Sequence, residues 1–376
     1  MIADPAAAGR PVFYALPEWL VVVFYLLSAL ALGIFFYGAY RRWRVYGRGR
    51  RTPEERLTMA RAVRAVVEIF LNRALWRDDR YAGAAHTLVF WGFGGLFIAT
   101  LIVLVDNDLL RPLIPRWQFL HGAFYLGFSW AADLFGLALL AGLAIFATRR
   151  WLRWPPRLQY ATREDTRHLP SPLALVHEDW IFLLLLVAAG LGGFVVEAVR
   201  IAATWPPFER ASFAGWALAG MLSGALGSGR AQAIFPYTWV VHALTALAFV
   251  AYIPHSKAWH MVAAWYTTAL AGDGARRTLP QAASDGGGYA RLADLTVGEL
   301  VMLDACTRCG RCEAECPAAA SGFPLSPRNL ILALRAQVEA EAIRPPRFAV
   351  AGGALPAAAP SGADPSGHPD HAKGGG

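Results

Sequence analysis

All four cysteines of the chain fall in one run, Cys306-Thr-Arg-Cys309-Gly-Arg-Cys312-Glu-Ala-Glu-Cys316-Pro317. The spacing C-x2-C-x2-C-x3-C-P brings thiolates within reach of different irons of one [4Fe–4S] cluster. A zinc site usually has two C-x2-C pairs held well apart, and disulfide frameworks belong to small secreted domains, so both fit this run less well. The run therefore predicts that Cys306, Cys309, Cys312 and Cys316 are the metal ligands of an iron–sulfur cluster.

The fourth cysteine of the run leaves two alternatives open. In two-cluster ferredoxins, the fourth Cys of such a run binds the other cluster, and this chain has no second run. Either all four thiolates close one cluster locally, or the missing ligand lies on a partner or on a stretch absent from this chain. We expect Cys316 to matter less to the cluster of the isolated chain than the other three cysteines.

The composition indicates a membrane protein. Of the 376 residues, 56% are hydrophobic and only 16% are charged. Buried helices of a large soluble core would show polar stripes at a 3.6-residue period, and the apolar segments show none. Five segments are long enough to span a bilayer, over residues 19–40, 86–105, 119–147, 180–203 and 238–264.

The net charge of +8 is distributed in a way that predicts orientation and not nucleic-acid binding. Arginines are concentrated in the connections after the first and third spans, over residues 41–80 and 149–167, and the opposite connections hold few. By the positive-inside rule, the arginine-rich connections are cytoplasmic. We therefore expect a multi-pass protein of the inner (cytoplasmic) membrane with its N-terminus outside and its cysteine run in the cytoplasm. An amphipathic helix over 53–76 is expected to lie on the inner membrane surface.

Four histidines lie within the predicted spans, where an ionisable side chain is costly and so a functional candidate. His86 and His260 lie toward the cytoplasmic side, and His121 and His242 lie toward the outer side. On one continuous helix, the 18 residues from His242 to His260 make about five turns and place both on one face. Depth then predicts two pairs, His86 with His260 and His121 with His242, each binding one haem b through two imidazoles.

Other polar residues in the spans give weaker indications. Any single histidine could instead be a hydrogen-bonding residue at a helix interface, and His255 points away from the face of His242, as an interfacial or quinone-site residue would. Glu197 and Arg200 could neutralise each other, or lie beside a haem propionate or in a proton route to a quinone. No nucleophile constellation, phosphate loop or nucleic-acid motif is present, and we assign no catalytic residue.

The fold class that follows is an all-α membrane protein, in which a five-helix cytochrome b bundle precedes a small helical [4Fe–4S] ferredoxin-type module. The predicted division is a transmembrane domain over 1–271, a linker over 272–288, a partial ferredoxin-type domain over 289–343 and a disordered tail over 344–376. Within the module we expect a short helix over 289–305. A second helix, over about 328–341, is opened by Ser326-Pro327.

Two parts of the chain resemble a known family. The stretches Ala85-His86-Thr-Leu-Val-Phe-Trp91-Gly92-Phe and Val241-His242-Ala-Leu, with Ile253-Pro-His-Ser-Lys257 and His260, resemble the gamma subunit of respiratory nitrate reductase, a five-span dihaem cytochrome b. The likeness is to the version fused to heterodisulfide-reductase-like iron–sulfur oxidoreductases. Residues 304–317 and 322–331 are similar to the first ferredoxin half of that family. The resemblance covers roughly residues 17–345 and is strongest at the cysteines.

The resemblance implies a quinone oxidoreductase that moves electrons between menaquinone or ubiquinone, haem b and cytoplasmic iron–sulfur clusters. This chain departs from the pattern of that family in two ways. The nitrate reductase subunit draws both histidines of one ligand pair from its second span, whereas this chain has only His86 there and supplies His121 from the third. The fused family also continues into a second cysteine run and catalytic domains, so we expect a chain truncated after its first ferredoxin motif.

The resulting hypothesis is an electron-transfer subunit of a respiratory-type oxidoreductase. Its expected partners are membrane lipid, quinone and a soluble iron–sulfur or flavoprotein subunit, similar to an electron-transfer flavoprotein or to heterodisulfide reductase. One alternative is a non-redox anchor that only docks a soluble reductase, which would need neither paired histidines nor the cysteine run. A transporter is another, and it should show inverted repeats and discontinuous spans that are not found.

Overall fold

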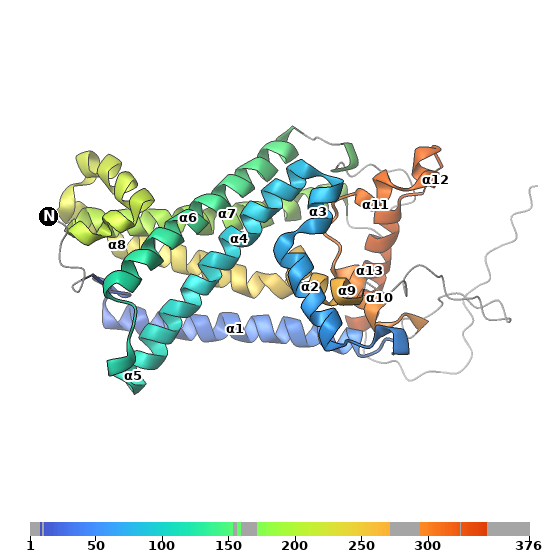
Figure 1. Cartoon of the computed structure of the whole chain (residues 1–376), viewed down its shortest axis with the longest axis horizontal. Coiled ribbons are helices and arrows are strands. Elements are labelled where there is room, and N and C mark those ends of the chain that lie inside the picture. The colour runs from blue at the N-terminus through green and yellow to red at the C-terminus, as the bar shows by residue number, and fades with distance from the viewer. Residues whose placement is uncertain are drawn as a thin grey trace, which may run out of the picture.

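The computed structural model describes residues 8–9, 11–152, 156–158, 171–270, 294–323 and 325–343. These residues are mostly helical, with isolated bridges and no strand among them (Figure 1). Five helices are long and apolar enough to cross a membrane, namely α1 (Glu18–Tyr46), α4 (Arg80–Val103), α6 (Gly122–Trp151), α7 (Pro172–Thr204) and α8 (Phe213–Tyr252). The predictions of a helical fold and of five apolar spans are confirmed. The predicted linker over 272–288 and tail over 344–376 lie outside the described residues.

The long helices pack as two tight pairs, α4 with α6 and α7 with α8. Glycines allow the close approach of α4 and α6. A Cβ atom on Gly92 would lie 2.5 Å from the backbone nitrogen of Leu139, and one on Gly142 would lie 2.7 Å from the carbonyl oxygen of Ala85. Helices in a bilayer gain stability from this close packing of small residues, because lipid offers no hydrophobic drive for their association.

One end of the bundle carries most of the short helices and the cysteine run, and we call it the module end (Figure 1). The opposite end is called the far end. The module end holds α2 (Met59–Leu71), α3 (Arg73–Asp78), α9 (His260–Leu270), α10 (Val297–Asp304), α11 (Arg311–Ala314), α12 (Pro317–Ala320) and α13 (Pro327–Ile343). At the far end, α4 runs on through a π-helical turn at Leu104–Leu110 into the short α5 (Arg111–Leu113).

The fifth predicted span, over 238–264, does not exist as one helix. Helix α8 ends at Tyr252, and two short 3-10 turns, Ile253–His255 and Lys257–Trp259, separate it from α9. Pro254 favours the end of the helix here, because it lacks an N–H and its ring crowds the preceding turn. Ser256 is extended, and its side chain accepts a hydrogen bond from the backbone N–H of Ala258, which starts the next turn. The prediction that His242 and His260 share one face of one helix is therefore wrong.

The amphipathic helix predicted over 53–76 is also divided. It consists of a 3-10 turn at Pro53–Glu55, then α2 and α3, and α2 ends at Asn72 in a left-handed conformation with φ of 50°. Asparagine is among the few residues other than glycine that adopt this conformation readily. The reversal turns the buried Asn72 side chain toward α4.

The helix predicted over about 328–341 is present as α13. Of the helix predicted over 289–305, the structure has α10 from Val297 to Asp304; residues 294–296 lie before it, and residues 289–293 are outside the described part of the chain. Helix α10 begins with a capping box, in which Thr296 accepts from the backbone N–H of Glu299 and the Glu299 carboxylate accepts from the backbone N–H of Thr296. Helix α13 begins as predicted, with the Ser326 hydroxyl accepting from the backbone N–H of Asn329 and with Pro327 in the first position. These two helices flank the cysteine run.

Candidate redox site

The cysteine run, which we call the cysteine loop, follows α10: Cys306 and Cys309 lie between α10 and α11, Cys312 lies in α11, and Cys316 directly precedes α12. Arg308 and Gly310 have positive φ values of 64° and 70°, which lets the backbone curl around the side chains of the run. The backbone N–H of Arg308 faces the Cys306 sulfur, and those of Cys312 and Glu313 face the Cys312 sulfur. Such N–H groups stabilise a bound anion, and an iron–sulfur cluster with its thiolates is anionic.

Three of the four cysteines interact with one another. Burial raises the pKa of the Cys306 thiol, and the charge of Cys309 raises it further. Burial also raises the pKa of Cys312, with further contributions from Cys306 and Cys309. Within the described ranges, no three Cys, His, Asp or Glu side chains converge tightly enough to hold a single metal ion. A cube of four irons takes one thiolate per iron, so its ligands need not meet at one point, and the donor set fits such a cluster.

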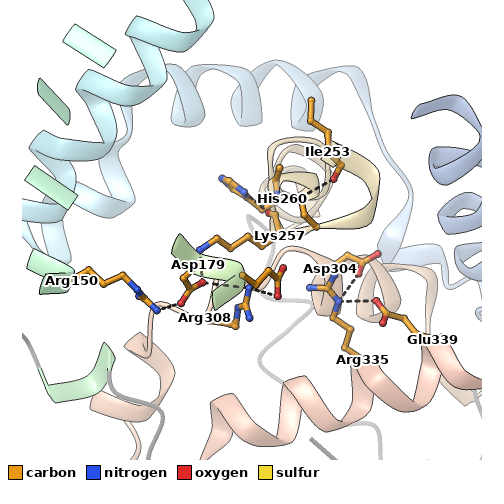
Figure 2. Close-up of polar contacts among 12 residues, drawn as sticks. Arg150, Asp179, Ile253, Lys257, His260, Asp304, Arg308, Arg335 and Glu339 are labelled. Atoms are coloured by element: carbon orange, nitrogen blue, oxygen red, sulfur yellow. Dashed lines mark hydrogen bonds and ion pairs between the residues drawn. The ribbon is translucent and has the colours of Figure 1, made fainter. Parts of the chain in front are cut away.

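An ion-pair cluster fixes this loop to the bundle. Arg308, between the first two cysteines, lies 2.8 Å from the Glu178 carboxylate and 3.4 Å from that of Asp179, both in the first turns of α7. Asp179 also accepts from Lys257, at 2.5 Å, and from Arg150 at the end of α6 (Figure 2). The side chains of Arg308 and Asp179 are only 4% and 2% exposed, so the contact is shielded from water.

A second contact joins the loop to the connection between α6 and α7. A side chain at Gly310 would collide with the carbonyl oxygen of Arg157, and Arg328 of α13 donates to the same oxygen at 2.7 Å. Arg157 in turn pairs with Asp79 at 2.7 Å, as does Arg149 at 2.6 Å. Burial by itself would raise the pKa of Asp79, but the hydrogen bond and charge of Arg149 outweigh it, and the pKa is lowered.

A third contact joins α10 to α1. Asp304, two residues before Cys306, pairs with Arg42 of α1 at 2.6 Å and with Arg335 of α13 at 3.3 Å. Tyr46 donates its hydroxyl hydrogen to Asp304 and accepts from the indole N–H of Trp259 at 3.0 Å. Trp259 directly precedes His260, so both sides of the cysteine loop are tied to the segment that carries this histidine.

His86 and His260 are brought together at the module end, near enough for their imidazoles to interact electrostatically. In each ring, Nδ1 lies on an oxygen acceptor, 2.9 Å from the side-chain oxygen of Asn72 for His86 and 2.8 Å from the backbone oxygen of Lys257 for His260. Because these oxygens accept, Nδ1 carries the proton and Nε2 keeps its lone pair. Metal-binding histidines are held in this way, so each ring has the tautomer that a haem ligand needs.

His121 and His242 are not brought together. His121 precedes α6 at the far end, where its exposed ring bonds the backbone oxygen of Gln118 at 3.1 Å. His242 packs against α7, where a Cβ atom on Gly192 would lie 3.0 Å from its Nδ1. Nearby Phe194 contacts Gly136 of α6. His121 is therefore roughly 20 Å of helix rise from the level of His242, and this pair does not fit a second haem.

The polar residues predicted near the outer side pair differently from expectation. Arg200 bonds Glu209 at 2.5 Å and not chiefly its helix neighbour Glu197, which hydrogen-bonds Asp133. Glu209 also accepts from Tyr125 at 2.8 Å. Burial alone would raise the pKa of Glu209, but the hydrogen bond and charge of Arg200 lower it overall. This network ties α6, α7 and the start of α8 together at the far end.

The sequence offered little sign of the residues that assemble the module end. Asp179 follows His177 and Glu178, and Asn72 precedes Arg73, so neither stands out from its polar neighbours, and the partners of both are distant in the chain. Arg308 lies inside the cysteine run, and its position alone could have marked it as a contact residue. Pro254, followed by Ser256, was the one local signal that the fifth span ends early.

Comparison with known proteins supports the iron–sulfur assignment. No family model and no solved structure match the chain. It is 29% identical over 341 residues to an EtfAB:quinone oxidoreductase of Syntrophomonas wolfei, covering 86% of this chain and 44% of that protein. It is 25% identical over 319 residues to the probable iron-sulfur-binding oxidoreductase FadF of Bacillus subtilis, with coverages of 84% and 42%.

A third relative is named for its membrane attachment. A probable membrane-anchored ferredoxin of Chromohalobacter salexigens is 28% identical over 313 residues, covering 81% of this chain and 40% of that protein. The chain thus spans less than half the length of each of these curated relatives. Together with the cysteine run and the five apolar helices, these names support a membrane-associated iron–sulfur oxidoreductase involved in electron transfer.

Proposed function

We propose that this protein carries electrons between the quinone pool and a soluble redox partner, through one b haem held by His86 and His260 and one [4Fe–4S] cluster held by the cysteine run. The observation that carries the proposal is the attachment of the cysteine loop to the bundle beside His260. Asp179 bonds both Arg308 of the loop and Lys257, whose backbone oxygen orients His260. A haem and a cluster bound at these residues would each supply a one-electron carrier.

The residues of the chain have distinct roles in this proposal. Asn72 and the Lys257 carbonyl hold the two imidazoles in the tautomer that leaves Nε2 available. Burial lowers the pKa of His260, which keeps its ring neutral, as a metal ligand must be. Asp179, Asp304 and the Arg157 carbonyl hold the loop still, and a fixed distance between two carriers is what electron transfer between them requires. A second haem at His121 and His242 forms no part of the proposal.

The proposed quinone substrate and soluble partner are taken from the name of one similar protein. The Syntrophomonas protein is named as an EtfAB:quinone oxidoreductase, and we extend to this chain a quinone as the membrane-side substrate and an electron-transfer flavoprotein as the soluble partner. Orientation rests on charge. The arginine-rich connections over 41–80 and 149–167 include α2, α3 and Arg157, which lie at the module end, so this end is proposed to face the cytoplasm.

Spectroscopy of the purified full chain tests the proposal. Reduced-minus-oxidised visible spectra should show a b-type haem at one per chain, and low-temperature EPR of the reduced protein should show an iron–sulfur signal. His260→Ala should abolish the haem spectrum and keep the EPR signal, and Cys306→Ser should do the reverse. His121→Ala is the matched control and should change neither. A chain that binds neither group after anaerobic reconstitution would instead be the non-redox anchor.

A further inference from the structure

A groove of about 600 Å³ lies at the module end, between α1 and the cysteine module. Its first wall is one face of the last turns of α1, formed by Tyr37, Arg41 and Arg44, and it continues to Arg48 just past the end of the helix. The opposite wall comes from α10 and α13 and includes apolar residues, namely Leu300, Leu303 and Val338. His255 and Pro254 close the groove toward the bundle, where His255 packs over Gly38.

The charges around the groove are unbalanced. Two acids line the groove, and both are already paired: Asp304 with Arg42 and Arg335, and Glu339 with Arg335. The side chains of Arg41, Arg44 and Arg48 are exposed. Within the part of the chain that the structure describes, none of these three arginines forms an ion pair. The groove therefore combines an apolar wall with a row of guanidinium groups that have no carboxylate to neutralise them.

We infer that this groove binds the headgroup of an anionic phospholipid, with the phosphate on Arg41, Arg44 and Arg48. Helix α1 is apolar along most of its length and ends in arginines. If α1 crosses a membrane, its arginine end, and with it the row, lies at the level of the lipid phosphates. Guanidinium groups match the geometry of phosphate oxygens, and the apolar wall accommodates the glycerol and upper acyl chains. A docking protein would need a surface of about 1,000 Å² or more, whereas this groove has the size of a headgroup.

A lipid bound here would touch both α1 and the module. It would then extend the Arg42–Asp304 contact that already joins them, and the lipid would stabilise the docked position of the cysteine loop. This inference concerns the membrane attachment of the module and does not depend on the proposed electron transfer.

Binding of a fluorescent short-chain phosphatidylglycerol to the full chain in detergent tests the site, with phosphatidylcholine and inorganic phosphate as comparison ligands. The triple variant Arg41→Gln, Arg44→Gln, Arg48→Gln should bind phosphatidylglycerol about a hundredfold more weakly, at about fivefold per arginine. The control triple Arg73→Gln, Arg77→Gln, Arg80→Gln removes the same charge from exposed positions at the module end outside the groove. It should bind like the wild type.

The inference is overturned if both triples weaken binding equally, since that is general electrostatic attraction, or if the groove triple binds like the wild type. Displacement of the lipid by millimolar inorganic phosphate would show a free-phosphate site and would also overturn it. Arg48→Gln alone, at one exposed position, gives the same test at about fivefold where the triple variant does not fold.

Discussion

Arg308, the residue before the second cysteine of the run, lies 3.4 Å from Asp179 in the N-terminal part of α7, in a contact almost closed to water. Asp179 is shared by Arg150, Lys257 and Arg308, which come from α6, from the segment before α9 and from the cysteine loop (Figure 2). One carboxylate therefore joins the cysteine loop to two parts of the helical bundle.

Replacing Asp179 with Asn should loosen the module. Three cations would be left close together without their shared acid, and removing one partner from a buried ion pair costs about 3–5 kcal/mol. Limited proteolysis of the full chain should then release the module faster than from the wild type. Glu178→Gln is the matched control, because Glu178 is 35% exposed and, among the described residues, forms an ion pair with Arg308 alone, so it should behave nearly as the wild type. Equal resistance of the Asp179 variant would contradict the proposed role of this contact.

The histidine pairing predicts how haem content depends on each ring. His86→Ala and His260→Ala should each remove the same haem, because both rings bind one iron, and pyridine haemochrome assays of the two variants should give equal losses. Asn72→Ala should retain part of the haem but weaken its binding roughly 10- to 100-fold, since it removes the oxygen that orients His86. Loss of different haems in the two histidine variants would show that the pairing is wrong.

The cysteines should contribute unequally to the cluster. Cys306, Cys309 and Cys312 act on one another electrostatically, and the fourth Cys of such a run serves a neighbouring cluster in two-cluster ferredoxins. After anaerobic reconstitution, Cys316→Ser should retain more iron per chain than Cys312→Ser. A stable four-iron cluster that is lost specifically in Cys316→Ser would mean that all four ligands are local.

Charge asymmetry predicts the orientation in the membrane. The arginine-rich connections and the cysteine module lie at the same end of the bundle, so a reporter fused after residue 343 should behave as cytoplasmic. Alkaline phosphatase and green fluorescent protein fusions at this point should give opposite results, with only the second active. An active phosphatase fusion would place the module outside.

The far-end network predicts a dependence of stability on pH. Arg200 and Glu209 are buried, so Glu209→Gln should lower stability by about 3–5 kcal/mol, seen as a lower melting temperature in detergent. The lowered pKa of Glu209 means that its contribution is complete above the ordinary glutamate pKa of about 4.3 and is lost as the pH falls through the lower folded value. In Glu209→Gln, the part of the acid-induced loss of stability that comes from protonation of Glu209 should be absent.

The sequence alone was enough to predict the elements whose causes are local. The lengths of the apolar segments predicted five helices, and Ser326-Pro327 predicted the start of α13. The cysteine spacing predicted an iron–sulfur loop, which the names of two relatives support. Each follows from neighbouring residues, because helix length, capping and ligand spacing act over a few turns of chain.

Only the tertiary structure decided which distant residues meet. Matching the histidines by their predicted depth in the membrane paired His86 with His260, and the two rings do lie close together. The same matching placed His121 beside His242, which is wrong, because the position of His242 along the bundle depends on how α6, α7 and α8 pack. The contact of Arg308 with Asp179 likewise joins segments that no local pattern connects. Packing sets the relative shift and rotation of helices through side-chain fit, and a hydrophobic pattern read along one helix does not contain that information.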